Sequence, residues 1–586
     1  MKKKVLLLMS CFLAFVLVLA ACGNGDDDDN VDTDDNGYDI VDENGGDDEL
    51  DEPDDQPGED TGLPDGLYVD ENGNYRFTDA RTISVALWDR GNERIPDFDE
   101  SHWADWVAEQ MLETHNVIIE WEPISRWDEE EVISTLLGAG AAPDVGVTFS
   151  NPLVSSFAEM GGIINLYEYL PEYREFLPNL YGHLLDEFVY WDLNPDTGEL
   201  WTITGREAQH GRVLTFIRED WLNALDLPIP ETLEEFEETL IAFRDRADEL
   251  PGDIGDDVIP YFVSDDVGWD MQAVIESFIP NDVTEREWFV NGFDDRRFFF
   301  EDAIRDSARI FNRWYYEDLL WNDFTIAESE IGHDRIRLGH VGAFTQNWDM
   351  PYRPADRWTV GDDSMRANIG DDANYIPITP FPNDAGEIVK YMPNSNARFI
   401  FFPHTNDEIL ASFLYLDFMS RASTLEYLQL GVEGVHRETN ADGSITILGE
   451  TDDHEFPDNM VIPSAFNFDI TITANGISDV DILQNAYPGI SPETILAARE
   501  LGLSHRYVFR HVTVRGIEAE GGMSEPLRDA RDVLLHVVIA GTPPEDFDEV
   551  FDAQYEAWLN LGAREIREER DEAWVEAFGD VDSMPE

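Results

Sequence analysis

Lysine and cysteine are almost absent from this chain of 586 residues. After Lys2, Lys3 and Lys4 the only lysine is Lys390, so arginine and histidine carry the remaining positive charge. Arginine keeps its charge at a pH at which lysine loses its own. We infer an alkaline or saline extracellular medium, with a genome-wide drift in composition as the alternative explanation.

Positive charge is scarce overall, with 38 Lys and Arg against 125 Asp and Glu and a net charge of -87. A nucleic-acid-binding protein needs a basic surface, so this class is excluded. Catalytic motifs of the G-x-S-x-G, H-E-x-x-H and P-loop types are absent as well. Paired carboxylates, which a glycosidase needs at a defined separation, arise by chance in so acidic a chain and carry no information.

The first residues form a processing signal. Basic residues precede an apolar run from Val5 to Leu19, which is too short for a membrane-spanning helix. The run ends in Leu19-Ala20-Ala21-Cys22-Gly23, which resembles a bacterial lipobox whose cysteine receives fatty acids such as palmitate. We expect residues 1–21 to be removed as a signal peptide and Cys22 to carry the lipid, which leaves no cysteine pair for a disulfide. An ordinary secretory signal is the alternative.

An acidic segment follows the lipobox. Residues 26–60 contain 19 acidic side chains and no basic ones. Such a segment buries too little apolar surface to fold, and its like charges keep it extended. We therefore expect residues 22–64 to form a disordered acidic tether behind the lipidated Cys22.

Strands and helices alternate at the start of the body. The apolar patterns predict strands that contain Ile83, Val85 and Leu87, then 117–121 and 145–149, with helices at 101–115 and 126–137 between them. This order is typical of a parallel sheet. Ligands of such sheets bind beyond the carboxyl ends of the strands. Trp88–Asp89 and Thr148–Asn151 lie at two such ends.

Later segments favour further helices and one more strand. Thr232 and Glu235 have the spacing of a capping box before a helix with Phe236 and Leu240 on one face. Other patterns predict helices at about 297–317, 407–421 and from Phe547 to Gly562, a strand at 400–402, and a last helix to about Phe578.

Four motifs in this order resemble bacterial family 1 extracellular solute-binding proteins, especially the large lipoprotein branch with oligosaccharide ligands. They are similar to Ser-Gly-x-x-Pro-Asp-Val at 138–145, to Arg-x-Asp-Trp-Leu with Pro-x-Thr-x-x-Glu-Phe at 218–236, to Gly-x-Glu-Gly-x-His at 431–436, and to the family's carboxyl-terminal helix pattern at 547–566. The similarity extends over nearly the whole body.

The resemblance implies an α/β fold of the periplasmic-binding-protein type II class, with two discontinuous lobes joined by a hinge. We expect lobe 1 at 78–203 plus 394–445 and lobe 2 at 204–393 plus 446–586. The crossings between them are expected near 202–205 and 393–398. By the same resemblance the protein is an extracellular, lipid-anchored component of an ABC importer that closes on an oligosaccharide and docks on membrane permease subunits.

Sugar sites combine aromatic faces with planar polar groups, which suggests the ligand-binding candidates. They are Trp88, Asn151, Trp201, Gln346, Asn347, Trp348, Glu433 and His436. For the tryptophans the alternative is core packing, and for Glu433 and His436 it is the ordering of their own loop. Arg218, Asp220 and Trp221 match the family too, but an Arg-x-Asp pair beside a tryptophan favours a structural network.

Some relatives carry a calcium loop after the Arg-x-Asp-Trp helix. The corresponding stretch here keeps Asp248, Asp253 and Asp257, with a shortened spacing and no asparagine ligands. Calcium prefers six to eight oxygens, so these residues are the candidate ligands of a structural ion and no other cofactor is expected. We expect a binding protein and no enzyme. A membrane-anchored glycoside hydrolase and a wall-associated adhesion or sensor protein are the alternatives.

Overall fold

Two hydrophobic cores organise the folded part of the chain. The computed structural model describes residues 63–584 except 65, 90–100, 127, 184–192, 194–196, 208–212, 253, 293–296, 327–328, 354–359, 361–363, 393–395, 442, 444, 449–472, 476–483, 485–486, 488–489, 505, 509–513, 515–516 and 518. The expected signal peptide, the lipid site Cys22 and nearly all of the tether lie outside these residues. No helix in the described part combines the length and apolar character that a membrane crossing requires.

Parallel strands build the first core, as their alternation with helices predicts. β3 (Arg81–Asp89) and β4 (Val117–Ser125) pair in parallel along their whole length. Val85 bridges Val145 in parallel just before β5 (Gly146–Thr148). The connecting helices are α2 (His102–His115) and α3 (Glu129–Ala139). The helix expected from residue 126 thus begins only at Glu129, whereas α2 begins as expected after Ser101, whose side chain accepts from the Ala104 N–H at 3.4 Å.

The sheet continues with strands that arrive from distant parts of the sequence. β5 pairs antiparallel with β12 (Asn396–Phe401), which pairs antiparallel with β6 (Ile203–Glu207). β15 (Ala474–Asn475) joins β6 in parallel. The two segments expected to cross between lobes are therefore hydrogen-bonded neighbours, with Ile203 opposite Ile400 and Gly205 opposite Arg398.

Helices cover the first sheet. They are α4 (Asn151–Glu159), α5 (Leu170–Tyr173), α6 (Pro178–His183), α16 (Ile409–Met419) and α17 (Ala422–Leu430). From Ala411 to Met419 every residue of α16 is buried, as in a helix enclosed on all sides. Two hairpins flank this core, β1 (Leu67–Val69) with β2 (Tyr75–Phe77) and β13 (Arg437–Thr439) with β14 (Ile445–Ile447).

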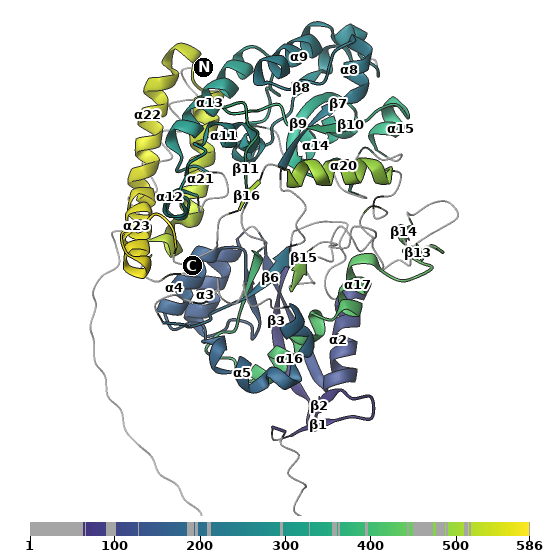
Figure 1. Cartoon of the computed structure of the whole chain (residues 1–586), viewed down its shortest axis with the longest axis vertical. Helices are drawn as coiled ribbons and strands as arrows, with labels where there is room; N and C mark the ends of the chain where they lie inside the picture. The colour runs from purple at the N-terminus through teal and green to yellow at the C-terminus, as the bar shows by residue number, and fades with distance from the viewer. Residues whose placement is uncertain are drawn as a thin grey trace, which may run out of the picture. The chain divides into compact units, whose positions relative to one another are not determined.

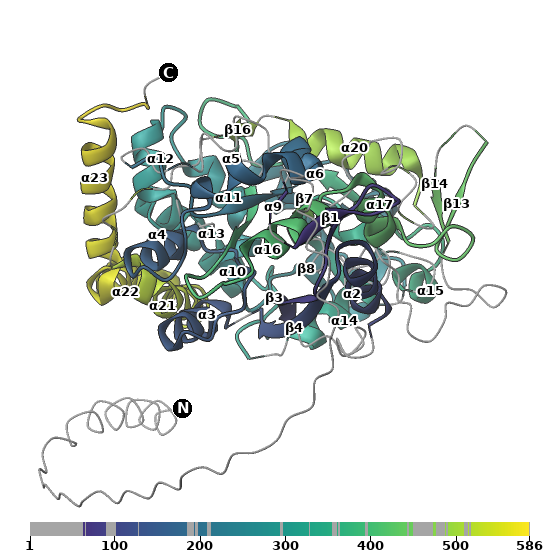
Figure 2. The ribbon, with the colours of Figure 1, turned by 90° about the horizontal axis from the view of Figure 1, so that it is seen from below.

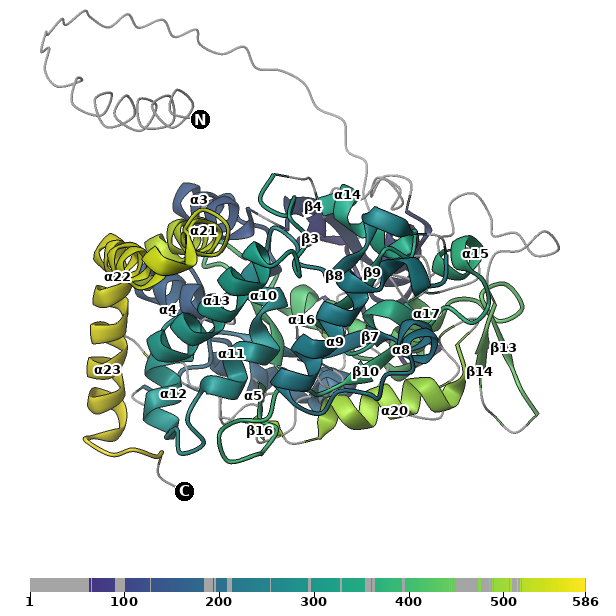
Figure 3. The same ribbon diagram turned by 90° about the horizontal axis from the view of Figure 1, so that it is seen from above.

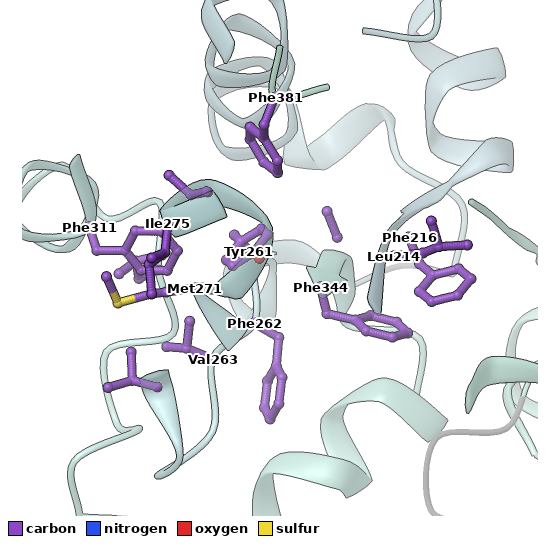
Figure 4. Close-up of a cluster of buried hydrophobic side chains, with 14 of the residues drawn as sticks. Leu214, Phe216, Tyr261, Phe262, Val263, Met271, Ile275, Phe311, Phe344 and Phe381 are labelled. Atoms are coloured by element: carbon purple, nitrogen blue, oxygen red, sulfur yellow. The ribbon is translucent and has the colours of Figure 1, made fainter. Parts of the chain in front are cut away.

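A four-stranded mixed sheet forms the second core. Its order is β10 (Tyr375–Ile378), β7 (Val213–Arg218), β9 (Val341–Asn347) and β8 (Ile259–Tyr261), and only β8 and β9 are parallel. Figure 4 shows Tyr261, Phe262, Phe311, Phe344 and Phe381 among the buried side chains of this core. Two further strands, β11 (Lys390–Met392) and β16 (Arg506–Val508), form a separate short parallel pair.

The helices around the second sheet come mostly from the middle of the chain (Figure 1). They are α8 (Glu219–Leu225), α9 (Leu233–Asp245), α10 (Val267–Asp270), α11 (Gln272–Phe278), α12 (Glu285–Asn291), α13 (Glu301–Tyr316), α14 (Ser329–Arg337), α15 (Met365–Ile369) and α20 (Pro492–Leu503). The expected capping box before α9 is only half formed. Thr232 accepts from the Glu235 N–H at 3.2 Å, but the Glu235 carboxylate accepts from the Glu231 N–H instead of from Thr232. A complete box forms at Thr284 and Glu287 before α12.

Three carboxyl-terminal helices complete the described part of the chain, and the first of them contacts both cores. They are α21 (Glu520–Ile539), α22 (Phe547–Trp558) and α23 (Arg564–Phe578), drawn in yellow to yellow-green in Figures 2 and 3. Gly562, at a φ of 139°, breaks the helical path between α22 and α23, as expected from the sequence. α21 contacts α13 of the second core and α4 of the first. The Ser155 hydroxyl on α4 also donates to the Val514 carbonyl at 2.6 Å.

Core membership changes three times along the chain. The first core takes residues from Leu67 to Ile203 and from Phe399 to Leu428. The second takes residues from Leu214 to Tyr391 and from Leu430 to Ile566. The lobe boundaries given from the sequence stay predictions, because core membership alone does not define a body that moves.

A buried ion pair fixes the start of α8 to the second sheet. The Arg218 guanidinium donates to both carboxylate oxygens of Asp220 at 2.7 and 2.6 Å and to the Gly339 carbonyl at 2.7 Å. It also lies over the Trp221 ring, 4.8 Å from the centroid. This geometry agrees with the structural role expected from the sequence.

Removing one member of this pair should destabilise the protein strongly. Asp220→Ala leaves a fully buried guanidinium without its counter-ion, which costs about 3–5 kcal/mol of unfolding free energy. Urea denaturation measures this cost. Asp245→Ala, which breaks the more exposed pair with Arg244, is the control and should leave the midpoint near that of the wild type. Equal midpoints for both variants would contradict the structural role.

Candidate functional site

The carboxyl ends of the first core's parallel strands bring together aromatic and basic side chains. The Trp88 ring at the end of β3 stacks on Phe149 just after β5, with centroids 4.1 Å apart. The Arg126 guanidinium, just after β4, lies 4.0 Å from the Phe149 centroid. Arg398 on β12 lies 5.4 Å from the Trp88 centroid. We call these four residues the first edge.

A buried carboxylate, that of Glu129, holds the chain in place at the end of β5, next to the first edge. Glu129, at the start of α3, accepts from the Phe149 N–H at 2.9 Å and from the Thr148 hydroxyl at 3.3 Å. Arg126 Nη1 lies 3.5 Å from its other oxygen. Burial raises the pKa of Glu129, while Arg126 acts in the opposite direction. Glu129 thus holds the end of β5, and with it the Phe149 ring.

The parallel strands of the second core end beside a second polar group. β9 ends at Gln346 and Asn347, and β8 leads through Ser264 into α10. The Trp269 indole N–H on α10 donates to Gln346 Oε1 at 2.8 Å. We call Trp269, Gln346 and Asn347 the second edge. Asn347 pairs with Val213, the first residue of β7. β7 is the strand that follows β6 in the chain, so the second edge lies beside the start of the strand that comes after the first expected crossing.

The buried carboxyl group of Asp270 lies next to the second edge, one residue after Trp269 in α10. Asp270 is 1% exposed and accepts from the Ser264 N–H at 2.6 Å and from the Ser264 hydroxyl at 2.7 Å. Burial is the main cause that raises the pKa of Asp270, the hydrogen bonds from Ser264 lower it, and Asp266 and Asp265 raise it, with a resulting pKa of about 8. Asp270 therefore anchors the end of α10, next to Trp269.

The three tryptophans expected to contact sugar are buried in this structure. Trp88 is 2% exposed, Trp201 3% and Trp348 4%. Trp201 belongs to the first core, and Trp348 meets Tyr487 edge-on at 6.1 Å within the second. The faces of these rings are covered by protein, and their roles as ligand contacts stay predictions. Gln346 and Asn347 are partly exposed.

Glu433 and His436 bond within their own loop. The Glu433 carboxylate accepts from the N–H and the hydroxyl of Thr439 at 2.8 and 2.9 Å, and these bonds lower the pKa of Glu433. His436 is buried, and its Nδ1 accepts from the Val432 N–H at 3.1 Å. The contacts match the loop-ordering alternative, while a ligand role for either residue stays a prediction.

The remaining candidates are partly outside the described residues. Asn151 begins α4, but its side chain is not described, and Asp253 is not described at all. Asp248 and Asp257 are exposed in neighbouring turns, and Asp257 lies 3.9 Å from Arg335. Within the described ranges no three His, Cys, Asp or Glu side chains could hold one ion. A calcium role for Asp248, Asp253 and Asp257 stays a prediction.

Trp269 is the residue that the sequence did not single out. β8 is only three residues long and contains Pro260, so no alternating pattern marks it as a strand. The tryptophan count alone does not separate Trp269 from the buried rings. The clue available in the sequence is its place soon after the Ile259-Pro260-Tyr261 segment.

Comparison of folds shows that the chain has the fold of several solved solute-binding proteins. It aligns over 85% of its length with 98% of the alginate-binding protein AlgQ2, at a TM-score of 0.61 and 16% identity. It aligns over 85% of its length with 99% of the Streptococcus pneumoniae ABC-transporter substrate-binding protein FusA in complex with kestose, at 0.60 and 13%. For the N-glycan transport solute-binding protein NgtS of the same species, the shares are 85% and 99%, at 0.51 and 12%.

The class of fold follows from these alignments. The chain has the two-lobed α/β fold of type II solute-binding proteins, as expected from the sequence. No protein-family model and no curated protein matches the chain. Each of the two cores has one of the two edges, and the assignment of the cores to the two lobes stays a prediction.

The raised pKa of Asp270 predicts a pH-dependent stability. Its folded pKa of about 8 exceeds the unfolded value of about 4, so between these pH values the folded state holds a proton that the unfolded state lacks. The contribution of Asp270 to the unfolding free energy therefore falls as pH rises through this window and is constant above it.

Asp270→Asn tests this directly, because the amide is neutral at every pH and its oxygen can still accept from Ser264. Melting temperatures from pH 5 to 9 should show the variant gaining on the wild type as pH rises. A difference that does not change with pH would show that Asp270 is already ionised in the folded protein.

Proposed function

We propose that this protein is the substrate-binding component of an ABC importer and that it captures oligosaccharides by closure of its two lobes. The observation that carries the proposal is the fold, together with an edge of parallel strand ends in each lobe. In open α/β sheets ligands bind beyond the carboxyl ends of strands, so a ligand that contacts both edges favours the closed form.

The choice of oligosaccharides rests on two supports. The fold relatives with the higher TM-scores are described as binding alginate and kestose. The second edge of this chain also combines a partly exposed indole with two amide side chains. An aromatic ring covers the C–H face of a sugar, and amides bond its hydroxyls.

The remaining parts of the proposal concern location and partners. Cys22 carries the lipid that holds the protein on the extracellular face of the cell membrane, behind a signal peptide at 1–21. The closed protein docks on membrane permease subunits, and ATP hydrolysis occurs on separate subunits. Asp248, Asp253 and Asp257 are the candidate calcium ligands. The binding experiments are therefore run both with calcium and with a chelator.

A thermal-shift screen tests the binding function. Residues 61–586 are melted with kestose, an alginate tetrasaccharide or chitotriose, with calcium or a chelator. A ligand at 100 times its dissociation constant stabilises the protein by about 2.7 kcal/mol, so one sugar class should raise the melting temperature. Chromatography should then recover that sugar intact. Cleavage of the sugar would point to a hydrolase, and no shift with any sugar would contradict oligosaccharide binding.

The acidity of the chain predicts that binding strengthens with salt. The net charge of -87 makes the two lobes repel each other, and salt screens this repulsion over about 8 Å at physiological ionic strength. Calorimetric titration with the identified sugar is carried out in about 0.05 to 1 M sodium chloride, and at 1 M the Debye length has fallen to about 3 Å. The affinity for the sugar should rise across this series. An affinity independent of salt would contradict closure against repulsion.

A further inference from the structure

The amide of Gln346 has a fixed orientation. Its Oε1 accepts from the Trp269 indole N–H at 2.8 Å and from the Asn347 backbone N–H at 2.9 Å. Both partners can only donate, so the atom between them must be the carbonyl oxygen. The two lone pairs of Oε1 are then used, and only the Nε2 amino group is left for a further partner. Nε2 forms no hydrogen bond with any residue in the described part of the chain.

The Trp269 indole is restricted in a related way. Its only donor, Nε1–H, is held by Gln346, so a ligand can meet Trp269 only through the ring. The ring is partly exposed, unlike that of Trp348, which is 4% exposed. At the second edge the ring and the Nε2 donor are therefore linked by one hydrogen bond.

Hydrogen bonds hold in place the segments that carry Trp269 and Gln346. The Asp266 side chain accepts from the Trp269 backbone N–H at 3.3 Å, and Asp270 bonds twice to Ser264. The Tyr261 hydroxyl lies 3.0 Å from the Asp270 carbonyl and 2.7 Å from the Thr345 hydroxyl, one residue before Gln346. Tyr261 is fully buried and lies among the hydrophobic side chains drawn in Figure 4. Segments held in this way lower the cost of ordering the contact residues when a ligand binds.

We propose that Trp269 and Gln346 act as one preset sugar-contact unit in the second lobe. The Trp269 ring covers the C–H face of one sugar residue, and Gln346 Nε2 donates to an acceptor on the same residue, such as a hydroxyl or acetamido oxygen. This assignment rests on the proposed function, since it names the residues of the second lobe that recognise the oligosaccharide. Gln346 selects for acceptors because it cannot accept further bonds.

Gln346→Glu separates the two roles of this side chain. The carboxylate still accepts from Trp269 and Asn347, but it cannot donate to the ligand. The affinity of this variant is measured by calorimetry with the sugar that stabilises the wild type, which is kestose, alginate tetrasaccharide or chitotriose. We expect this affinity to be about tenfold lower than that of the wild type. Trp269→Ala should weaken binding by a similar factor, and the double variant should lose less than the product of the two factors because the residues act together.

Controls separate this unit from general effects. Gln110→Glu adds the same charge on the exposed face of α2, and Trp121→Phe alters a partly exposed tryptophan on β4, so both should keep wild-type affinity. In 15N-labelled protein the indole resonance that Trp269→Phe removes should shift on sugar binding. Wild-type affinity and an unshifted resonance in variants that melt normally would overturn the unit while leaving the proposed function intact. A wild type that binds none of the sugars would overturn both.

Discussion

The antiparallel pairing of β6 with β12 is the constraint on which the architecture depends. Both strands carry the chain from one core to the other, and their register sets Ile203 opposite Ile400 and Gly205 opposite Arg398. Because Arg398 of β12 lies over Trp88 and itself belongs to the first edge, the pairing of β6 with β12 extends into that edge. Val213 continues from β6 to pair with Asn347 at the second edge. β6 and β7 therefore follow one another in the chain, with Gly205 of β6 opposite Arg398 and Val213 of β7 opposite Asn347.

The two edges differ in how they are held. The first edge is an aromatic and guanidinium stack supported by the buried Glu129, with Trp88 covered on its faces. The second edge is a hydrogen-bonded indole and amide on a buried Asp, Ser, Tyr and Thr network. Buried networks of this kind are rigid when every member is satisfied. The first edge is thus held mainly by ring and guanidinium stacking, and the second edge by hydrogen bonds.

Sequence patterns predicted those parts of the fold that local periodicity determines. The β3, α2 and β4 order follows from apolar spacing, and Gly562 breaks a helix because it can adopt a positive φ. Four ordered motifs predicted the fold class. Local periodicity alone did not predict the second sheet, because β8 has three residues and lacks a period. The half-formed box at Thr232 shows the same limit, since the Glu235 side chain bonds Glu231 instead.

The candidate site was harder to predict, because its contacts join residues far apart in the chain. Trp88 was expected at a strand end and lies there, but its burial depends on Phe149 and on Arg398. Trp269 becomes distinctive only through its bond to Gln346. Spacing along the sequence contains no information on either contact. Residue type and strand ends therefore predicted that Trp88 lies at the end of β3, and tertiary packing decided that its ring is buried there.

Hydrogen exchange with bound oligosaccharide tests the central claim, that one ligand lies between the two edges. Exchange of backbone amides is compared with and without a saturating concentration of the sugar found by thermal shift. We expect slower exchange at Arg126 and Phe149 in the first lobe and at Trp269, Gln346 and Asn347 in the second. Slower exchange confined to one lobe, or to α21–α23, would contradict an account in which the lobes close on a shared oligosaccharide.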